Sequence, residues 1–153
     1  MISGGIDLPG AWCDGIRHYE NAVKSLIVPD GVKGFADEFL RGWAVTESFI
    51  LPNTIKSIEG NNIGCVFADC YLPEVKLPES TICLGTFAFG HAYIRKLVVP
   101  LSVKSEYRRQ FKDTTIEELY LPKAGLEALK QSNRDYEFYR NFYCHCKCNI
   151  IEY

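Results

Sequence analysis

The chain has 153 residues, 47% of which are hydrophobic, and carries a formal net charge of −2 at pH 7. These values predict one globular domain with a continuous core, and they argue against an obligate polyanion binder or a strongly acidic tail. No stretch approaches the ~20 apolar residues that a membrane helix needs, so we expect no membrane association.

Residues 1–22 predict an incomplete first coil of the structure. They contain the short phrase Ile6-Asp7-Leu8-Pro9, and the large aromatic Trp12 is placed to act as a lid on the core. The N-terminus has neither the basic nor the apolar region of a signal peptide. We therefore expect an intracellular, cytoplasmic protein, which would instead be secreted if a leader has been removed.

Residues 23–122 contain a recurring phrase of the form apolar-x-x-apolar-x-apolar-Pro. Its complete copies are 23–29, 46–52, 72–78, 94–100 and 116–122. From Pro9 onwards the prolines step by 20, 23, 26, 22 and 22 residues, a spacing typical of stacked structural repeats. The residues one and three places before each proline are apolar and share one face of a short strand, which the proline ends. Because so short a strand cannot bury its apolar face alone, we expect parallel stacking at roughly 4.8 Å.

The coils between these strands supply the rest of the predicted core. Six phenylalanines lie there and are expected to fill the space between strand and outer wall: Phe35, Phe39, Phe67, Phe87, Phe89 and Phe111. Glycines in the same coils are interpreted as turn residues, because they permit backbone conformations that other residues disfavour.

Residues 123–153 predict a C-terminal cap that differs from the repeats. A short helix is expected over 123–131, opened by Pro122 or Lys123. The alternating segment 142–150 predicts a closing strand. Atypical ends of this kind are expected of a solenoid.

Two of the repeated phrases, 72–78 (Leu-Pro-Glu-Val-Lys-Leu-Pro) and 94–100 (Ile-Arg-Lys-Leu-Val-Val-Pro), resemble the BspA-type leucine-rich repeat. The segment Phe67-Ala68-Asp69-Cys70 resembles the Ala-Phe-x-x-Cys segment of that family in reordered form, and the similarity covers about residues 6–122. The resemblance implies a right-handed solenoid with a parallel sheet on one side. It also implies a binding protein, since members are usually binding proteins and often bacterial surface proteins, and the repeat has no catalytic motif.

The predicted fold is therefore a leucine-rich-repeat-like solenoid that forms a single domain over residues 1–153. Short parallel β-strands lie on one face, irregular coils lie opposite, and the terminal caps are atypical.

The cysteines and histidines give no clear catalytic or metal site. Seven cysteines lie mostly at apolar repeat positions, which favours free buried thiols in a reducing compartment. Three of them fall in 144–148 (Cys-His-Cys-Lys-Cys), where a strand would point all three thiols to one side about 6.6–7 Å apart and so favours core packing over a zinc site. Neither His18, His91 nor His145 lies in a nucleophile–base motif. We expect no enzymatic activity, no metal and no cofactor.

The coil 104–112 mixes basic and aromatic residues, a combination that single-stranded nucleic acid favours. Nearby acidic residues reduce its potential: Glu106, Asp113, Glu117 and Glu118. We therefore interpret it as a solvated convex coil and keep nucleic-acid binding as an alternative.

The residues two places before each proline are expected to face outward from the sheet. They form a column of mostly apolar side chains: Ile27, Ile50, Lys76, Val98 and Tyr120. Glu74 and Lys96 belong to a flanking polar rim, and an apolar stripe with a polar rim is typical of a protein-binding patch. Strand propensity alone also favours such residues, and self-association into a homo-oligomer remains an alternative.

The sequence thus predicts a non-catalytic protein-interaction module that binds an unidentified partner protein on its exposed sheet face. It would act as an inhibitor or scaffold inside a cell, with a bacterial or phage-borne origin. The alternatives are nucleic-acid binding through 104–112 and a fragment of a bacterial surface adhesin.

Overall fold

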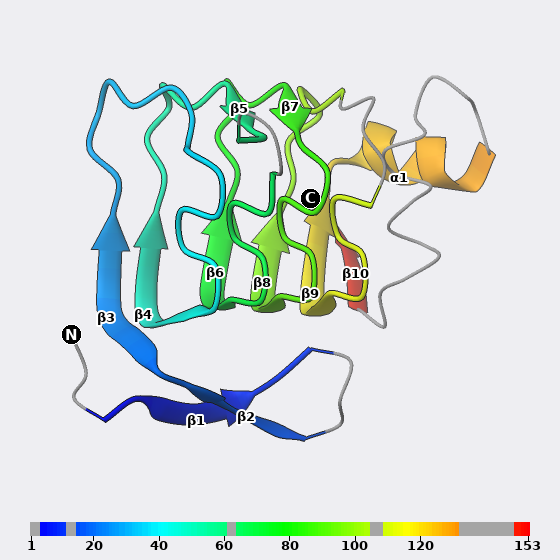
Figure 1. The fold of residues 1–153 in the computed structure, drawn as a ribbon. Helices are drawn as coiled ribbons and strands as arrows, with labels where there is room; N and C mark the ends of the chain where they lie inside the picture. Colours follow the sequence, from blue (N-terminus) through cyan, green and yellow to red (C-terminus); the bar gives the residue numbers. More distant parts are fainter. Residues whose placement is uncertain (1–3, 12–14, 61–63, 105–108, 132–148) are drawn as a thin grey trace.

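The computed structural model describes residues 4–11, 15–60, 64–104, 109–131 and 149–153. Its strands stack in parallel along one side of the molecule, and the chain returns through coils on the other side (Figure 1). The predicted repeat solenoid is confirmed. No helix in the described part of the chain is long and apolar enough to cross a membrane.

The main sheet has six strands in the order β10-β9-β8-β6-β4-β3. Their bounds are β3 Asn21–Ile27, β4 Trp43–Ile50, β6 Tyr71–Lys76, β8 Tyr93–Val98, β9 Thr115–Leu121 and β10 Asn149–Glu152. Neighbouring pairs in this sheet are all parallel. Along the upper edge of the molecule in Figure 1, the short strands β5 (Ser57–Ile58) and β7 (Cys83–Leu84) form a second parallel pair.

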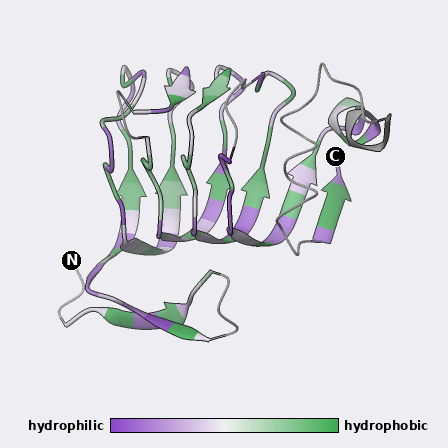
Figure 2. Cartoon of the chain, turned by 45° about the vertical axis from the view of Figure 1, so that its right-hand side comes forward, coloured by the Kyte–Doolittle hydropathy of each residue, from purple (hydrophilic) through white to green (hydrophobic). Residues whose placement is uncertain are grey.

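The inward positions of the repeat are buried as the pattern predicts. Leu97 and Val99 of one repeat and Leu119 and Leu121 of the next have no exposed surface. Figure 2 shows hydrophobic segments recurring in successive strands of the stack. Burying a Val or Leu side chain contributes about 1.5–3 kcal/mol, so the stacked repeats together offset much of the ordering entropy.

A column of aromatic rings runs through the core along the stack. The ring centroids of Phe111 and Phe89 lie 5.2 Å apart, those of Phe89 and Phe67 5.3 Å, and those of Phe67 and Phe35 5.0 Å. Phe35 in turn lies 5.3 Å from Phe39. Phe67 and Phe89 are fully buried, whereas Phe39 at the end of the column is 48% exposed. The prediction that these rings fill the coil interior is therefore correct for the inner rings and wrong for Phe39. It is also wrong for Phe87, which is half-buried and stacks on His91 outside the core.

The coils repeat their backbone geometry as well as their side chains. Cys65, Phe87 and Arg109 follow one another at 22-residue steps and adopt left-handed φ values of 55°, 55° and 65°. A second set, four residues later, does the same: Asp69 at 59°, His91 at 56° and Asp113 at 54°. Backbone hydrogen bonds join consecutive coils, with the Phe67 amide donating to the Ala88 carbonyl at 2.8 Å. These left-handed positions let the coil turn tightly without glycine at each site.

The N-terminal segment differs from the incomplete coil that the sequence predicts. Strands β1 (Ile6–Pro9) and β2 (Ile16–Tyr19) pair antiparallel, so this part is a hairpin and does not extend the solenoid. It lies below the lower edge of the sheet in Figure 1. The alternating pattern of Ile6-Asp7-Leu8-Pro9 suits either arrangement. The Gly10 amide donates to the Gly15 carbonyl at 3.2 Å, which continues the antiparallel pairing beyond Pro9 and Ile16. Trp12 lies outside the described residues.

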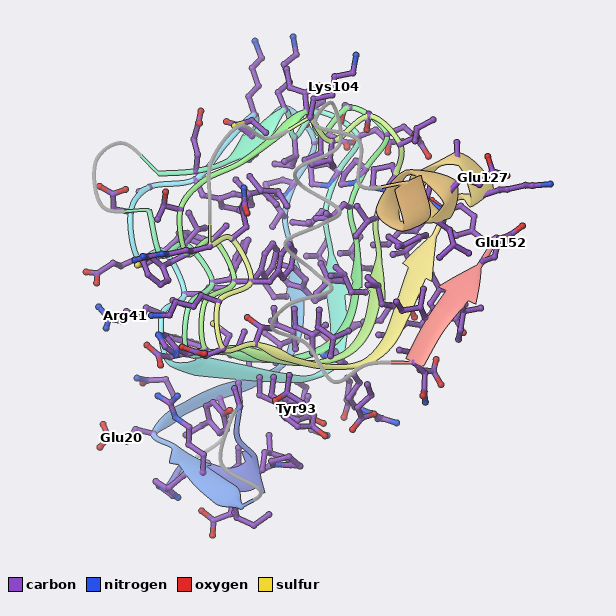
Figure 3. All side chains as sticks on the ribbon, turned by 90° about the vertical axis from the view of Figure 1, so that its right-hand side faces the viewer. Glu20, Arg41, Tyr93, Lys104, Glu127 and Glu152 are labelled. Atoms are coloured by element: carbon purple, nitrogen blue, oxygen red, sulfur yellow. The ribbon has the colours of Figure 1, made fainter. Side chains whose placement is uncertain are left out.

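The hairpin is attached through aromatic and charged contacts. The ring of Tyr19 packs edge-on against that of Tyr71 at 6.2 Å, and Tyr71 stacks on Tyr93 at 5.6 Å. Figure 3, which looks along the stack, places Tyr93 at the lower edge beside the hairpin. Arg17 of β2 also donates to the Asp69 carboxylate at 3.2 Å.

The C-terminal cap is partly described. The predicted helix is confirmed as α1 (Lys123–Gln131), and its Leu126 amide donates to the Pro122 carbonyl at 3.0 Å. Strand β10 pairs in parallel with β9, with Ile151 opposite Tyr120. Residues 149–150 of the predicted closing strand fall in β10, and 142–148 lie outside the described residues.

Candidate protein-binding face

The predicted outward column lies on the outer face of the six-stranded sheet. Register pairs align Ile27 with Ile50, Lys76 with Val98, and Val98 with Tyr120. The alternation of the strands therefore places these side chains on one face, as predicted. We call this surface the sheet face, defined by Ile27, Ile50, Lys76, Val98 and Tyr120.

The two ends of the sheet face differ in what they expose. Ile27 is 65% exposed and Ile50 is 49% exposed, and they lie opposite each other on β3 and β4. Val98 and Tyr120, at the other end, are half-buried. The apolar part that is open to solvent is thus concentrated on β3 and β4.

At the other end, polar contacts already engage the aromatic ring. The Lys96 ammonium lies 4.8 Å from the Tyr120 ring centroid and 3.1 Å from Glu74. The Tyr120 hydroxyl donates to Glu118 at 3.1 Å, and this hydrogen bond raises the pKa of Tyr120. The hydrogen bond to Glu74 likewise raises the pKa of Lys96. Because its ring and hydroxyl both have partners, Tyr120 offers less free surface than its position in the sequence indicates.

An opening in the sheet separates the two ends. Of the described residues, only Ala44 and Tyr71 form a register pair between β4 and β6, whereas five register pairs join β6 to β8. Pro73, which has no amide hydrogen, lies in β6 at a position missing from the β6–β8 register. On the other side of β6, no further register pair with β4 follows the pair of Ala44 with Tyr71 among the described residues. The ladder between β4 and β6 is therefore interrupted beyond this pair.

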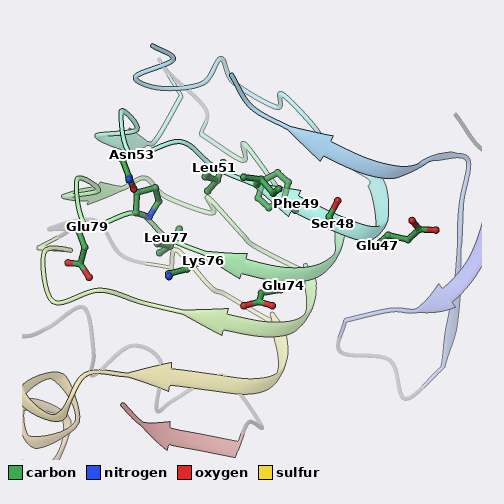
Figure 4. Close-up of a pocket in the computed structure, with 11 residues that line it drawn as sticks. Glu47, Ser48, Phe49, Leu51, Asn53, Glu74, Lys76, Leu77 and Glu79 are labelled. Carbon is green, nitrogen blue, oxygen red and sulfur yellow. The ribbon is translucent and has the colours of Figure 1, made fainter. Parts of the chain in front are cut away.

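This opening forms a pocket of about 580 Å³ on the sheet face (Figure 4). Its wall contains Ile50 and Lys76 from the predicted column and Glu74 from the predicted rim. Its further lining residues are Glu47, Ser48, Phe49, Leu51, Asn53, Leu77, Pro78 and Glu79. The structure thus brings three predicted site residues together around one concavity.

The rim of the pocket is charged but largely compensated. Glu47 lies 3.4 Å from the Lys24 ammonium, and Glu74 lies 3.1 Å from that of Lys96. These exposed pairs contribute little to stability, on the order of 0–1 kcal/mol each, and they are weakened by salt. The arrangement suits a partner whose apolar side chain enters the pocket and whose polar groups meet the rim.

Sequence reasoning did not predict the pocket. The one available signal was the 26-residue step from Pro52 to Pro78, the longest in the chain. Because the coil at this step is longer than the others, the strands on either side of it, β4 and β6, need not keep one continuous register.

The described cysteines do not form a reactive site. Cys70 is a buried free thiol, and the Cys83 thiol donates to the Glu59 carboxylate at 3.2 Å. The Cys70 thiol donates to the Leu40 carbonyl at 2.7 Å, and its burial raises its pKa to about 12. Burial also raises the pKa of Cys65. A thiol that stays protonated is a poor nucleophile and a poor metal ligand.

Other predicted motifs fall partly or wholly outside the described residues. The motif 144–148 lies outside them, as do residues 105–108 of the basic coil. In the described part of that coil, the Lys112 ammonium lies 5.8 Å from the Phe87 ring centroid and 3.9 Å from Asp113. Within the described ranges, no group of three or more potential ligands is placed to hold a metal ion.

The comparisons identify the repeat. A family model, the BspA type leucine rich repeat region, matches residues 33–152 in six copies. Neither a search of curated proteins nor a search of solved structures found a match.

Proposed function

Since the chain belongs to the BspA-type leucine-rich repeat family, we propose that it is a non-catalytic module that binds a partner protein on its sheet face. The family suggests a protein-interaction or surface-adhesin-like role, and leucine-rich repeat proteins are generally not enzymes. The finer proposal concerns the place of binding, which is centred on β3, β4 and the pocket between β4 and β6.

One observation carries this proposal. Ile27 and Ile50 lie opposite each other and are 65% and 49% exposed, and Ile50 lines a pocket that also contains Lys76 and Glu74. Exposed branched side chains next to a concavity are what the apolar centre of a protein interface needs, and the ion-paired rim supplies its polar border. The ladder holds these groups in place before binding, so that little conformational entropy is lost when a partner docks.

Affinity capture from lysate of the source cell or its host tests the proposal. The wild type is compared with an Ile27→Asp/Ile50→Asp double variant, after circular dichroism has established that both are folded. Ile82→Asp is the matched control, because Ile82 is 55% exposed and lies in the coil between β6 and β8, away from the sheet face. A protein captured by the wild type and the control but lost with the double variant supports the sheet face. Equal capture by all three proteins contradicts it.

We further propose an intracellular location, which the buried free thiol of Cys70 supports. Alkylation of unreduced cell extract, followed by mass spectrometry, measures how many of the seven cysteines are free. Extensive disulfide formation in the mature protein would contradict this location and favour a secreted adhesin.

A further inference from the structure

The two ends of the solenoid are not equally closed. At the C-terminal end, Ile116 and Leu119 of β9 have no exposed surface, and β10 continues the sheet beyond them. At the N-terminal end, Val23 and Leu26 occupy the same repeat positions on β3, yet both are only half-buried. The inward residues of the first strand therefore lack the neighbouring coil that covers their counterparts.

The aromatic column also emerges at this end. Phe35 covers Phe67, Phe39 lies 5.3 Å from Phe35, and Phe39 is 48% exposed. Val32 of the same coil is half-buried. We call this surface the open end, defined by Val23, Leu26, Val32, Phe35 and Phe39.

The hairpin does not cover the open end. Within the part of the chain that the structure describes, strands β1 and β2 pair only with each other, and they lie beneath the lower edge of the sheet (Figure 1). Among the described strands, β3 is therefore an edge strand of seven residues with a pairing partner on one side alone. An edge of this length next to apolar side chains invites pairing with another strand.

We propose that the open end binds the open end of a second copy of this chain, so that β3 pairs with β3 across a two-fold axis. A second copy offers both features that the surface requires, namely a free strand edge and an apolar coil beside that edge. The exposed charges of the coil at the open end support self-pairing. Asp30 and Glu38 balance Lys33 and Arg41, so charges of one sign do not dominate and two copies would not repel each other. Pairing of β3 with β3 uses the same edge of both copies, so the association closes at a dimer.

This surface is separate from the sheet face, because it is the end of the stack and not its outer side. The dimer would present two sheet faces on one continuous sheet. The inference goes beyond the proposed function, and either one can fail without the other.

Light scattering coupled to size exclusion, supported by sedimentation equilibrium, tests the proposal on the purified full chain. Over about 1–500 µM, the wild type should change from the mass of one chain to that of two, as mass action requires. Phe39→Asp should remain at one chain throughout, whereas the control Ile82→Asp and the face variant Ile50→Asp should dimerise as the wild type does. A wild type that stays at one chain over this range overturns the proposal and leaves the open end to another protein. So does a folded Phe39→Asp variant that still dimerises.

Hydrogen exchange of the wild type gives a second measurement that does not depend on any variant. Amides in residues 21–27 should exchange more slowly at high concentration than at low concentration, while those of β8 should not change. A dimer whose β3 amides exchange equally at both concentrations associates through another surface, and this result would also overturn the proposal.

Discussion

The Lys96 ammonium covers the ring of Tyr120 at 4.8 Å, so the one aromatic residue of the sheet face is already in contact with a cation of its own chain. The contact joins β8 to β9 across the sheet face and continues to Glu74 on β6. Ile27 and Ile50, by contrast, expose 65% and 49% of their surface to solvent.

This difference ranks the residues of the sheet face. Ile50→Ala should weaken capture of the partner more than Tyr120→Ala does, because Ile50 borders the pocket and is open to solvent. Quantitative mass spectrometry of captured protein, at equal amounts of folded bait, measures both effects. A larger loss with Tyr120→Ala would move the centre of the interface to β8 and β9.

Burial predicts unequal costs for the same substitution at one repeat position. Leu97→Ala should lower the free energy of unfolding by about 2–5 kcal/mol, because Leu97 is completely buried. Leu26→Ala should cost clearly less, because Leu26 is already half-exposed on β3. Urea denaturation, performed at low protein concentration so that association does not contribute, measures the two values. Equal costs would contradict the open end as described.

Backbone conformation and charge can be separated at Asp69. This residue has a left-handed φ of 59° and accepts hydrogen bonds from Arg17 at 3.2 Å and from Arg41 at 3.1 Å. Asp69→Asn should lose the charge but keep a residue that tolerates this φ, whereas Asp69→Ala should cost roughly 1 kcal/mol more. The comparison uses urea denaturation. Identical midpoints for the two variants would show that the φ value carries no cost.

The buried thiol predicts a loss of stability at alkaline pH. In the unfolded chain a cysteine ionises with its ordinary pKa of 9.0, whereas burial raises the pKa of Cys70 to about 12 in the fold. The unfolded state therefore binds fewer protons between these values, and the stability that is present below pH 9 falls as the pH rises towards 12. Tyr93, whose pKa is raised to about 12 by burial and by its hydrogen bond to Glu117, contributes to the same loss.

Thermal melts of the wild type and of Cys70→Ala across this range test the assignment. The slope of melting temperature against pH should be shallower in the variant, whatever its stability at neutral pH. An unchanged slope would show that Cys70 does not contribute.

Salt separates the two kinds of partner considered for this chain. Partner protein held by Ile27, Ile50 and the pocket should stay bound as salt is raised to about 1 M, because apolar contacts are not screened. Nucleic acid held by the coil 104–112 would be released steeply over the same range. Elution of the captured material in a salt gradient distinguishes them, and release at low salt would favour the alternative.

The sequence predicts the solenoid well because its evidence is repeated. Each inward residue, such as Leu77, Leu97 or Leu119, has counterparts at a regular step, and a wrong assignment at one repeat would conflict with the others. The hairpin at 6–19 has no such counterpart. Its short alternating strands carry the same period-two pattern in either an antiparallel pair or a stacked coil, so only tertiary contacts such as Tyr19 with Tyr71 decide between them.

The residues of the sheet face could be predicted from the sequence, but the exposure of each side chain and the position of the pocket could not. Period-two alternation places Ile50 and Tyr120 on one side, and the structure agrees. Alternation does not report which long side chains fold over their neighbours, as Lys96 does over Tyr120. Nor does it report where the ladder opens, because the interruption between β4 and β6 depends on how two coils of unequal length pack.

The left-handed positions at 22-residue steps have a consequence for the length of the molecule. Because Cys65, Phe87 and Arg109 repeat one backbone geometry, the segment between Pro78 and Pro100 acts as an interchangeable unit. We expect that a duplicate of this unit, inserted after Pro100, would add one strand and lengthen the stack by about 4.8 Å without altering either terminus. Repeat number would then set the length of the stack, and with it the distance between β3 at one edge of the sheet and β10 at the other.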